Sequence, residues 1–193
     1  AAMVRGMQSQ KIGATPKHFA CNNKETNRHN SDSILSERAL REIYLKGFEM
    51  AVKEAGARSV MTTYGSVNGL WTAGSYDLTT SILRKEWGFD GFVMTDWWAD
   101  INERGTAQSK SNFAAMVMAQ NDVYMVCSDS EENDDNTLSS LSEGKLKRSE
   151  LQRSAANICR FLMGSNAMKY FTDRYEPYDI INRPEEDKGN DEP

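Results

Sequence analysis

Long apolar segments are absent from the sequence. Its 193 residues are 39% hydrophobic and 26% charged, and no run approaches the roughly 18 consecutive apolar residues that span a bilayer. The first residues, AAMVRGMQSQK, contain no extended apolar core of the kind found in signal peptides. The composition therefore predicts a globular chain that has no membrane partner.

Cysteine is scarce, with only Cys21, Cys127 and Cys159. An odd number of widely spaced cysteines does not form a disulfide framework. The sequence also contains no Asn-x-Ser/Thr acceptor for N-glycosylation. Both features favour a reducing compartment, so we expect the cytoplasm slightly more than secretion.

A basic surface is also lacking, since 23 basic residues face 28 acidic ones and the net charge is −5. Residues 172–193 alone hold eight acidic and three basic side chains, which leaves the rest of the chain about neutral. Without a basic face, we expect no nucleic-acid partner. Because residues 172–193 are polar and poor in apolar side chains, they are predicted to form a disordered acidic tail.

Motifs for cofactors and metals are missing too. The sequence has no glycine-rich phosphate loop, no Cys/His zinc spacing and no Ser-His-Asp set. Residues 129–135 resemble a calcium loop in charge, but they lack its glycine at the sixth place and its glutamate at the twelfth. We therefore expect no cofactor and no metal site.

Strand-like and helix-like segments alternate along the chain, which predicts an α/β fold with a parallel sheet. Ser36 is a good N-cap for the first long helix, and Ser149 with Gln152 reads as a capping box for the last. The predicted strands cover residues 11–20, 59–65, 91–96 and 122–128. The predicted helices cover residues 36–56, 75–88, 111–121, 136–144 and 149–164.

Polar residues gather where each predicted strand ends: Lys17 and His18, then Tyr64, Asp96 and Ser128. In β/α barrels, sites form at that edge of the sheet. A whole (β/α)8 barrel takes about 250 residues, so four β/α units predict a partial TIM-type barrel over residues 1–171. A partial barrel leaves open sheet edges. We therefore expect an upstream part of the protein to complete it, and the edges also allow a homo-oligomer.

The stretch GFVMTDWW, residues 91–98, places a carboxylate directly after a buried strand. Trp97 and Trp98 follow Asp96, and indoles supply the apolar surface that the C–H face of a sugar ring requires. A carboxylate below such a ring can attack its anomeric carbon. Asp96 must stay ionised for that role, and Lys17, His18 or Arg28 can supply the nearby positive charge or hydrogen-bond donors.

Each of these residues also has a structural interpretation. Asp96 can be a loop or N-cap carboxylate, Lys17 a surface residue, His18 a structural hydrogen-bonding residue and Tyr64 a tyrosine at the rim of the sheet. Residue type and position alone leave both interpretations open.

Three motifs together decide between these interpretations, namely PKHFACNNKETNR, SVMTTYGSVNG and LRKEWGFDGFVMTDWW. In order and spacing, they resemble glycoside hydrolase family 3, most closely its β-glucosidase branch, over about residues 8–170. The resemblance implies that Asp96 is the catalytic nucleophile. It also implies that the sugar is bound by Lys17, His18, Arg28, Met61, Tyr64 and Trp97.

The resemblance implies a retaining, exo-acting hydrolase that releases glucose from β-glucosides or cello-oligosaccharides, as in cellulose degradation. It places this chain in the C-terminal half of a TIM barrel. The N-terminal half of the barrel is then missing, together with an α/β sandwich domain that carries the acid/base glutamate. The swapped order, with the sandwich before the barrel, is expected, and the chain alone should be inactive.

The sequence departs from the family pattern at two positions. Gly65 stands where asparagine is frequent, and Gln120 stands where glycine is frequent, which leaves the local loop geometry open. The segment KHFACNN, residues 17–23, argues against the β-N-acetylglucosaminidase branch, whose members have the motif KHFPGHG at this place. A β-xylosidase of the same family and an inactive carbohydrate-binding fragment remain as alternatives.

Overall fold

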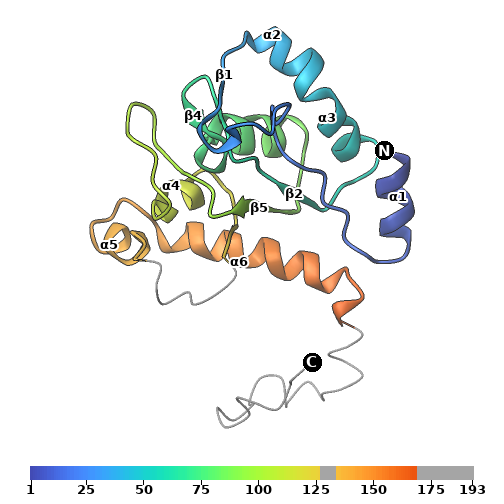
Figure 1. The fold of residues 1–193 in the computed structure, drawn as a ribbon. Helices are drawn as coiled ribbons and strands as arrows, with labels where there is room; N and C mark the ends of the chain where they lie inside the picture. Colours follow the sequence, from blue (N-terminus) through green and yellow to red (C-terminus); the bar gives the residue numbers. More distant parts are fainter. Residues whose placement is uncertain (127–133, 169–193) are drawn as a thin grey trace, which may run out of the picture.

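The computed structural model describes residues 1–126 and 134–168, and its centre is a three-stranded sheet of order β2-β5-β6 (Figure 1). The strands are β2 (Ser59–Met61), β5 (Phe92–Trp97) and β6 (Val123–Met125). Both neighbouring pairs are parallel. The predicted α/β class with a parallel sheet is therefore confirmed.

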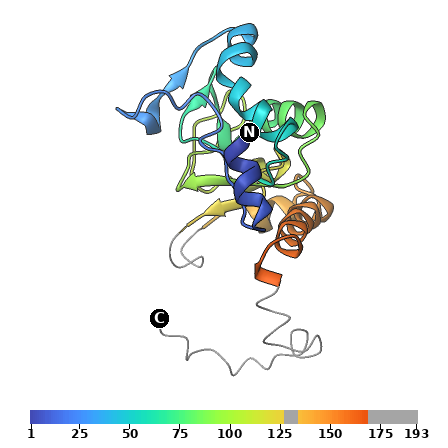
Figure 2. The same ribbon diagram turned by 90° about the vertical axis from the view of Figure 1, so that its right-hand side faces the viewer.

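Helices connect these strands and cover the sheet. Helix α6 (Arg148–Met163) contacts β5 and lies along one side of the sheet in both ribbon views (Figures 1 and 2). Further helices include α1 (Ala2–Ser9), α4 (Phe113–Met118), α5 (Thr137–Ser142) and the π-helical η4 (Asp77–Glu86). No helix in the described part of the chain has the length and apolar character needed to cross a membrane.

The helix predicted over residues 36–56 is confirmed as one continuous helical segment. It consists of α2 (Glu37–Ala39), the π-helical η2 (Leu40–Tyr44) and α3 (Lys46–Lys53). The Ser36 hydroxyl accepts a hydrogen bond from the Ala39 N–H at 3.2 Å, as expected of an N-cap. At the other end, Gly56 adopts a left-handed φ of 62°, which suits glycine because it has no Cβ.

The last helix, predicted over residues 149–164, is present one residue earlier as α6, but its predicted capping box is wrong. Ser149 and Gln152 do not form its capping box. Instead the Lys147 N–H donates to Glu150 Oε2 at 2.9 Å, and the helix begins at Arg148. A glutamate carboxylate in the first turn accepts a stronger hydrogen bond from a free N–H than a glutamine amide does, because the carboxylate is ionised.

The predicted strand over residues 11–20 is also wrong. This segment makes a single bridge to the sheet, between Phe19 and Thr62. The Phe19 N–H donates to the Met61 carbonyl at 2.8 Å, and the Pro16 carbonyl accepts from the Met61 N–H at 3.2 Å. Because proline has no N–H of its own, Pro16 can accept but cannot donate to a ladder. The segment still lies beside β2, where the prediction placed it.

Two predictions fall partly or wholly outside the described residues. The strand over residues 122–128 is present as β6, but residues 127 and 128 are not described. The predicted acidic tail, residues 172–193, is not described at all.

A second, smaller sheet was not predicted. It joins β1 (Asp32–Ser33), β3 (Ser66–Val67) and β4 (Leu70–Trp71) in the order β1-β3-β4. Asp32 Oδ1 accepts from the Ser66 hydroxyl at 2.7 Å and from the Gly69 N–H at 3.0 Å. These contacts attach the loop of residues 21–33 to the segment that follows β2. In both ribbon views, this loop lies on the side of the sheet away from α6.

Asn102 extends this small sheet toward the segment after β5. It is buried, its Oδ1 accepts from the Trp71 N–H at 2.9 Å, and its Nδ2 donates to the carbonyls of Gly69 and Thr106 at 3.2 Å each. Because all three partners are backbone groups, the Asn102 amide sets the position of two loops at once.

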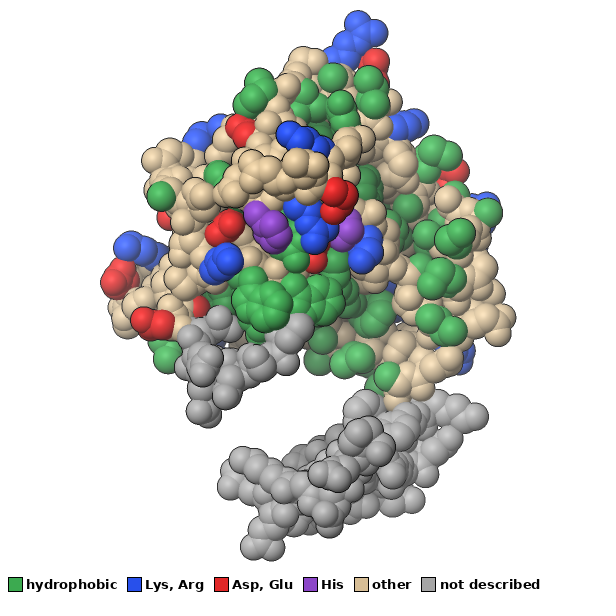
Figure 3. Space-filling model, viewed as in Figure 1, with side chains coloured by type: hydrophobic (Ala, Val, Ile, Leu, Met, Phe, Trp, Pro, Cys, Tyr) green, Lys and Arg blue, Asp and Glu red, His purple; other side chains and the backbone are tan. Residues whose placement is uncertain are grey.

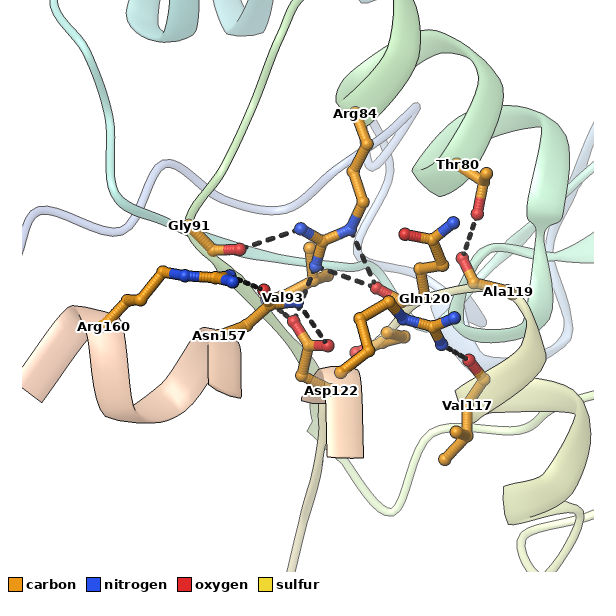
Figure 4. A network of polar contacts seen from close by, with 12 residues as sticks. Thr80, Arg84, Gly91, Val93, Val117, Ala119, Gln120, Asp122, Asn157 and Arg160 are labelled. Atoms are coloured by element: carbon orange, nitrogen blue, oxygen red, sulfur yellow. Dashed lines mark hydrogen bonds and ion pairs between the residues drawn. The ribbon is translucent and has the colours of Figure 1, made fainter. Parts of the chain in front are cut away.

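A buried ion pair joins the main sheet to its helices (Figure 4). Arg84 Nη2 lies 2.6 Å from Asp122 Oδ2, with the two side chains 9% and 0% exposed. The same carboxylate accepts from the Val93 N–H at 2.9 Å and from Asn157 Nδ2 at 3.1 Å. The pair therefore connects η4, β5, the start of β6 and α6.

The Gln120 backbone completes this network, and its carbonyl accepts from Arg84 Nε and Nη2 at 3.2 and 3.0 Å. Gln120 adopts a left-handed φ of 66°, a conformation that favours glycine. This geometry explains why glycine suits the position. The loop at position 120 therefore keeps the left-handed turn although the residue is glutamine rather than glycine.

Candidate active site

Asp96 lies at the carboxyl end of β5 and is 7% exposed. Its Oδ1 accepts from the Trp97 N–H at 2.9 Å, and its Oδ2 lies 3.2 Å from His18 Nε2. Two donors from different parts of the chain thus face one carboxylate. Hydrogen bonds of this kind fix the orientation of a carboxylate.

His18 reaches this carboxylate because Phe19, the next residue, is bridged to the sheet. Burial lowers the pKa of His18 below its usual 6.5, with Lys17 and Arg28 acting in the same direction and Asp96 opposing them. The ring is therefore neutral at pH 7. Its Nδ1 lies 3.5 Å from the Asn22 amide Nδ2, which assigns the ring proton to Nε2, the atom that faces Asp96.

Tyr64 and Arg28 form the second part of the site. The guanidinium carbon of Arg28 lies 4.7 Å from the centroid of the Tyr64 ring, a cation–π contact. Arg28 Nη1 also pairs with Glu25 Oε2 at 2.9 Å. The His29 ring packs against the same tyrosine, with the ring centroids 4.0 Å apart. Tyr64 is consequently 7% exposed although it follows the end of a strand.

Lys17, Met61 and Trp97 border these groups. Lys17 is exposed, Met61 is 5% exposed on β2, and Trp97 is partly buried. Met61 is paired in register with Met94, two residues before Asp96. The structure thus brings His18, Asp96 and the Trp97 backbone into contact. It brings Arg28 to Tyr64 and leaves Lys17 and Met61 at the border.

Sequence reasoning missed four residues around this site, namely Asn22, Glu25, His29 and Asp100. Glu25 stands three residues before Arg28, and that spacing was a usable signal. Asp100 follows Asp96 by four residues, and burial raises its pKa while Lys110 and His29 oppose the rise. His29 carried no signal, because its contact with Tyr64 depends on a turn that only the structure shows.

The arrangement offers an oriented carboxylate with a neutral imidazole donor on one side and aromatic side chains nearby. Figure 3 shows histidine, basic and acidic side chains grouped on one face, next to hydrophobic ones. Such a carboxylate can act as a nucleophile or as a base. Within residues 1–126 and 134–168, no three His, Cys, Asp or Glu side chains are grouped as metal ligands.

The sequence and the fold were compared with protein-family models, with curated proteins and with solved structures. The family model described as "Glycosyl hydrolase family 3 N terminal domain" matches residues 1–161. A protein named beta-glucosidase, from Ruminococcus albus, is 62% identical over 186 residues, which are 96% of this chain and 20% of that protein. An exo-alpha-(1->6)-L-arabinopyranosidase from Bifidobacterium longum is 49% identical over 105 residues, which cover 54% of this chain and 14% of that one.

Among solved structures, a beta-glucosidase from Paenibacillus barengoltzii superimposes with a TM-score of 0.82 at 53% identity. The match covers 87% of this chain and 19% of that one. The chain thus spans about a fifth of the length of the beta-glucosidases that it matches.

Proposed function

The chain belongs to glycosyl hydrolase family 3, and on this basis we propose that it is part of a β-glucosidase that releases glucose from β-glucosides and cello-oligosaccharides. The observation that carries the proposal is the Asp96 carboxylate, 7% exposed at the end of β5 with the His18 imidazole 3.2 Å away. The names of the beta-glucosidase relatives support the substrate class.

In the proposed reaction, the Asp96 carboxylate bonds to the anomeric carbon as the glycosidic C–O bond breaks, which forms a covalent glycosyl-enzyme intermediate. The acid/base glutamate of the partner domain protonates the departing oxygen and later takes a proton from the attacking water. Water then hydrolyses the intermediate with net retention, for which the two catalytic carboxyl groups lie about 5–5.5 Å apart. The donors at Asp96 support this role, since the Trp97 N–H holds Oδ1 and the His18 ring faces Oδ2. An ionised, oriented carboxylate reacts without first losing a proton.

The sugar would be held by the side chains around Asp96. Arg28 presents a rigid set of N–H donors suited to vicinal hydroxyl groups, and its stacking on Tyr64 limits its freedom. The partly buried Trp97 offers an apolar surface to the C–H face of the ring. The proposed sugar-binding residues are Lys17, His18, Arg28, Met61, Tyr64 and Trp97.

We also propose that residues 1–171 are the C-terminal part of a (β/α)8 barrel and that residues 172–193 are a separate acidic tail. The parallel order β2-β5-β6 supports this, as does the bridged segment at Phe19 beside β2. The partners needed to complete the site are the N-terminal half of the barrel and an α/β sandwich domain that supplies the acid/base glutamate. The open sheet edges also allow a homo-oligomer.

A pentopyranosidase is the second candidate function. The arabinopyranosidase relative shares 49% identity over a segment of this chain, and the β-xylosidase alternative also concerns a pentose substrate. These sugars lack the hydroxymethyl group of glucose. Comparison of kcat/KM on nitrophenyl β-glucoside, β-xyloside and α-L-arabinopyranoside separates the candidates, and we expect the β-glucoside to be preferred.

The deciding experiment traps the intermediate in the complete enzyme that carries this chain. A 2-deoxy-2-fluoro-glucoside should label Asp96, as read by peptide mass spectrometry. Asp96→Ala should lower kcat by several orders of magnitude. The matched control, Asp100→Asn, should lower kcat far less. A label on another residue, Asp100 included, would contradict the proposal.

A further inference from the structure

Tyr64 is held by a residue that the proposed mechanism does not use. The imidazole of His29 lies 4.0 Å from the Tyr64 ring, centroid to centroid, at an interplanar angle of 43°. Arg28 contacts the same ring. His29 itself is exposed whereas Tyr64 is buried, so the imidazole covers part of the tyrosine.

The backbone on both sides of His29 is fixed. Before it, Asn27 takes a left-handed φ of 56° and starts the short 3-10 turn η1 (Arg28–Asn30). After it, the Ser31 carbonyl accepts from the Ser66 N–H at 2.9 Å, and Asp32 is bound to Ser66 as described above. The turn that carries His29 is thus attached at its end to the segment that follows Tyr64.

Gly65 makes this close approach possible. A Cβ on Gly65 would lie 2.9 Å from the Ser31 carbonyl oxygen and 3.6 Å from that of Arg28. Since the nearest atom belongs to the backbone, a side chain at position 65 requires a shift of the backbone where the turn meets the segment after β2.

We propose that His29 is a positioning residue that holds the Tyr64 ring in the wall of the sugar subsite, and that Gly65 permits this contact. The inference rests on the proposed function and deepens it. Asp100, in the segment after β5, lies close enough to His29 for the two to interact electrostatically. The ring contact itself needs no charge, because aromatic side chains attract one another in tilted geometries.

The test uses kcat/KM for nitrophenyl β-glucoside in the complete enzyme. His29→Ala should lower kcat/KM about 3- to 10-fold, the range expected for one aromatic contact. His29→Phe keeps a ring and should stay within about 2-fold of the unaltered enzyme. Asn30→Ala is the matched control, since the Asn30 side chain bonds Asn27 in the same turn. All variants should keep their melting temperature.

A double-mutant cycle then separates positioning from a general structural effect. Gly65→Asn should lower kcat/KM about as much as His29→Ala does. In the double variant kcat/KM should fall by a smaller factor than the two single factors multiplied together, because both substitutions act through one contact. Equal values for His29→Ala and Asn30→Ala would overturn the inference. So would a His29→Phe variant that is as impaired as His29→Ala.

A spectroscopic readout distinguishes failure of this inference from failure of the proposed function. The ring protons of His29 should show a ring-current shift in NMR spectra that disappears in Tyr64→Leu. If the enzyme shows this shift but has no glucosidase activity, the proposed substrate class is refuted and the contact between His29 and Tyr64 stands. Absence of the shift would refute the contact whatever the activity.

Discussion

The neutral imidazole of His18 faces the Asp96 carboxylate across 3.2 Å. His18 comes from the segment bridged to Thr62 at Phe19, and Asp96 comes from the end of β5. Burial favours the uncharged ring, while the carboxylate favours the charged one, and burial has the larger effect on the pKa of His18. The pair is therefore a donor and an acceptor rather than two opposite charges at pH 7.

An NMR titration tests this assignment. The midpoint of His18 should lie below its usual 6.5, and Asp96→Asn should lower it further, because the carboxylate raises the pKa. A midpoint above 6.5, or a rise in Asp96→Asn, would contradict the burial argument. The sign for stability follows from the lowered pKa. The unfolded chain binds more protons, so the contribution of His18 is complete above pH 6.5 and is lost as the pH falls below it.

The buried Arg84–Asp122 pair should be essential for folding stability. Arg84→Met leaves a buried carboxylate without its cation, which typically costs about 3–5 kcal/mol. Arg38→Met is the matched control, because Arg38 and Glu42 form an exposed pair with side chains 83% and 61% accessible, and such pairs contribute little. Denaturant unfolding of both variants measures the difference. Similar midpoints would show that the network adds no net stability.

Replacing Gln120 by glycine should stabilise the protein. The left-handed φ of 66° at this position costs a residue with a side chain roughly 1–2 kcal/mol, part of which the greater freedom of unfolded glycine offsets. We expect a gain of about 0.5–1 kcal/mol in the free energy of unfolding. Gln120→Ala keeps a Cβ and serves as the control. A loss of stability in Gln120→Gly would mean that the glutamine side chain matters more than its backbone.

The chain expressed alone, as residues 1–193, should not hydrolyse a nitrophenyl β-glucoside above background. The proposal assigns it one of the two catalytic carboxylates and no general acid, and general acid catalysis is typically worth 10²–10⁴-fold. Its open sheet edges should cause self-association, which light scattering measures. A stable monomer with robust turnover would contradict the proposed barrel part, and it would point to an acid/base within the chain itself.

Elements with strong local signals were predictable from the sequence. The helix η4 and the strand β5 follow one another around Gly88, whose φ of 72° supplies the turn. A helical apolar pattern, a glycine and a short apolar run are all visible in the sequence. The strand over residues 11–20 failed because Pro16 removes a donor and the pairing partner is distant in sequence. The two-residue strands β1, β3 and β4 are too short for any periodic pattern.

For the candidate site, too, some residues could be predicted from the sequence and others could not. Asp96, His18 and Tyr64 were proposed from the sequence because each stands at the end of a predicted strand. In the structure Asp96 lies at the end of β5 and Tyr64 follows β2, whereas His18 lies beside β2 without a strand of its own. Their actual partners were not found. The contacts of Asn22 with His18 and of His29 with Tyr64 depend on backbone turns within residues 21–33, and a polar loop gives no periodic signal for them.

The small sheet β1-β3-β4 has a consequence for chimeric genes. Asp32, Ser66, Gly69 and Asn102 join three loops that are far apart in the sequence. A crossover between residues 33 and 66 would combine the loop of residues 21–33 of one parent with the strands β3 and β4 of another. Recombination libraries of such enzymes should therefore inherit residues 28–33, 65–71 and 102 from the same parent.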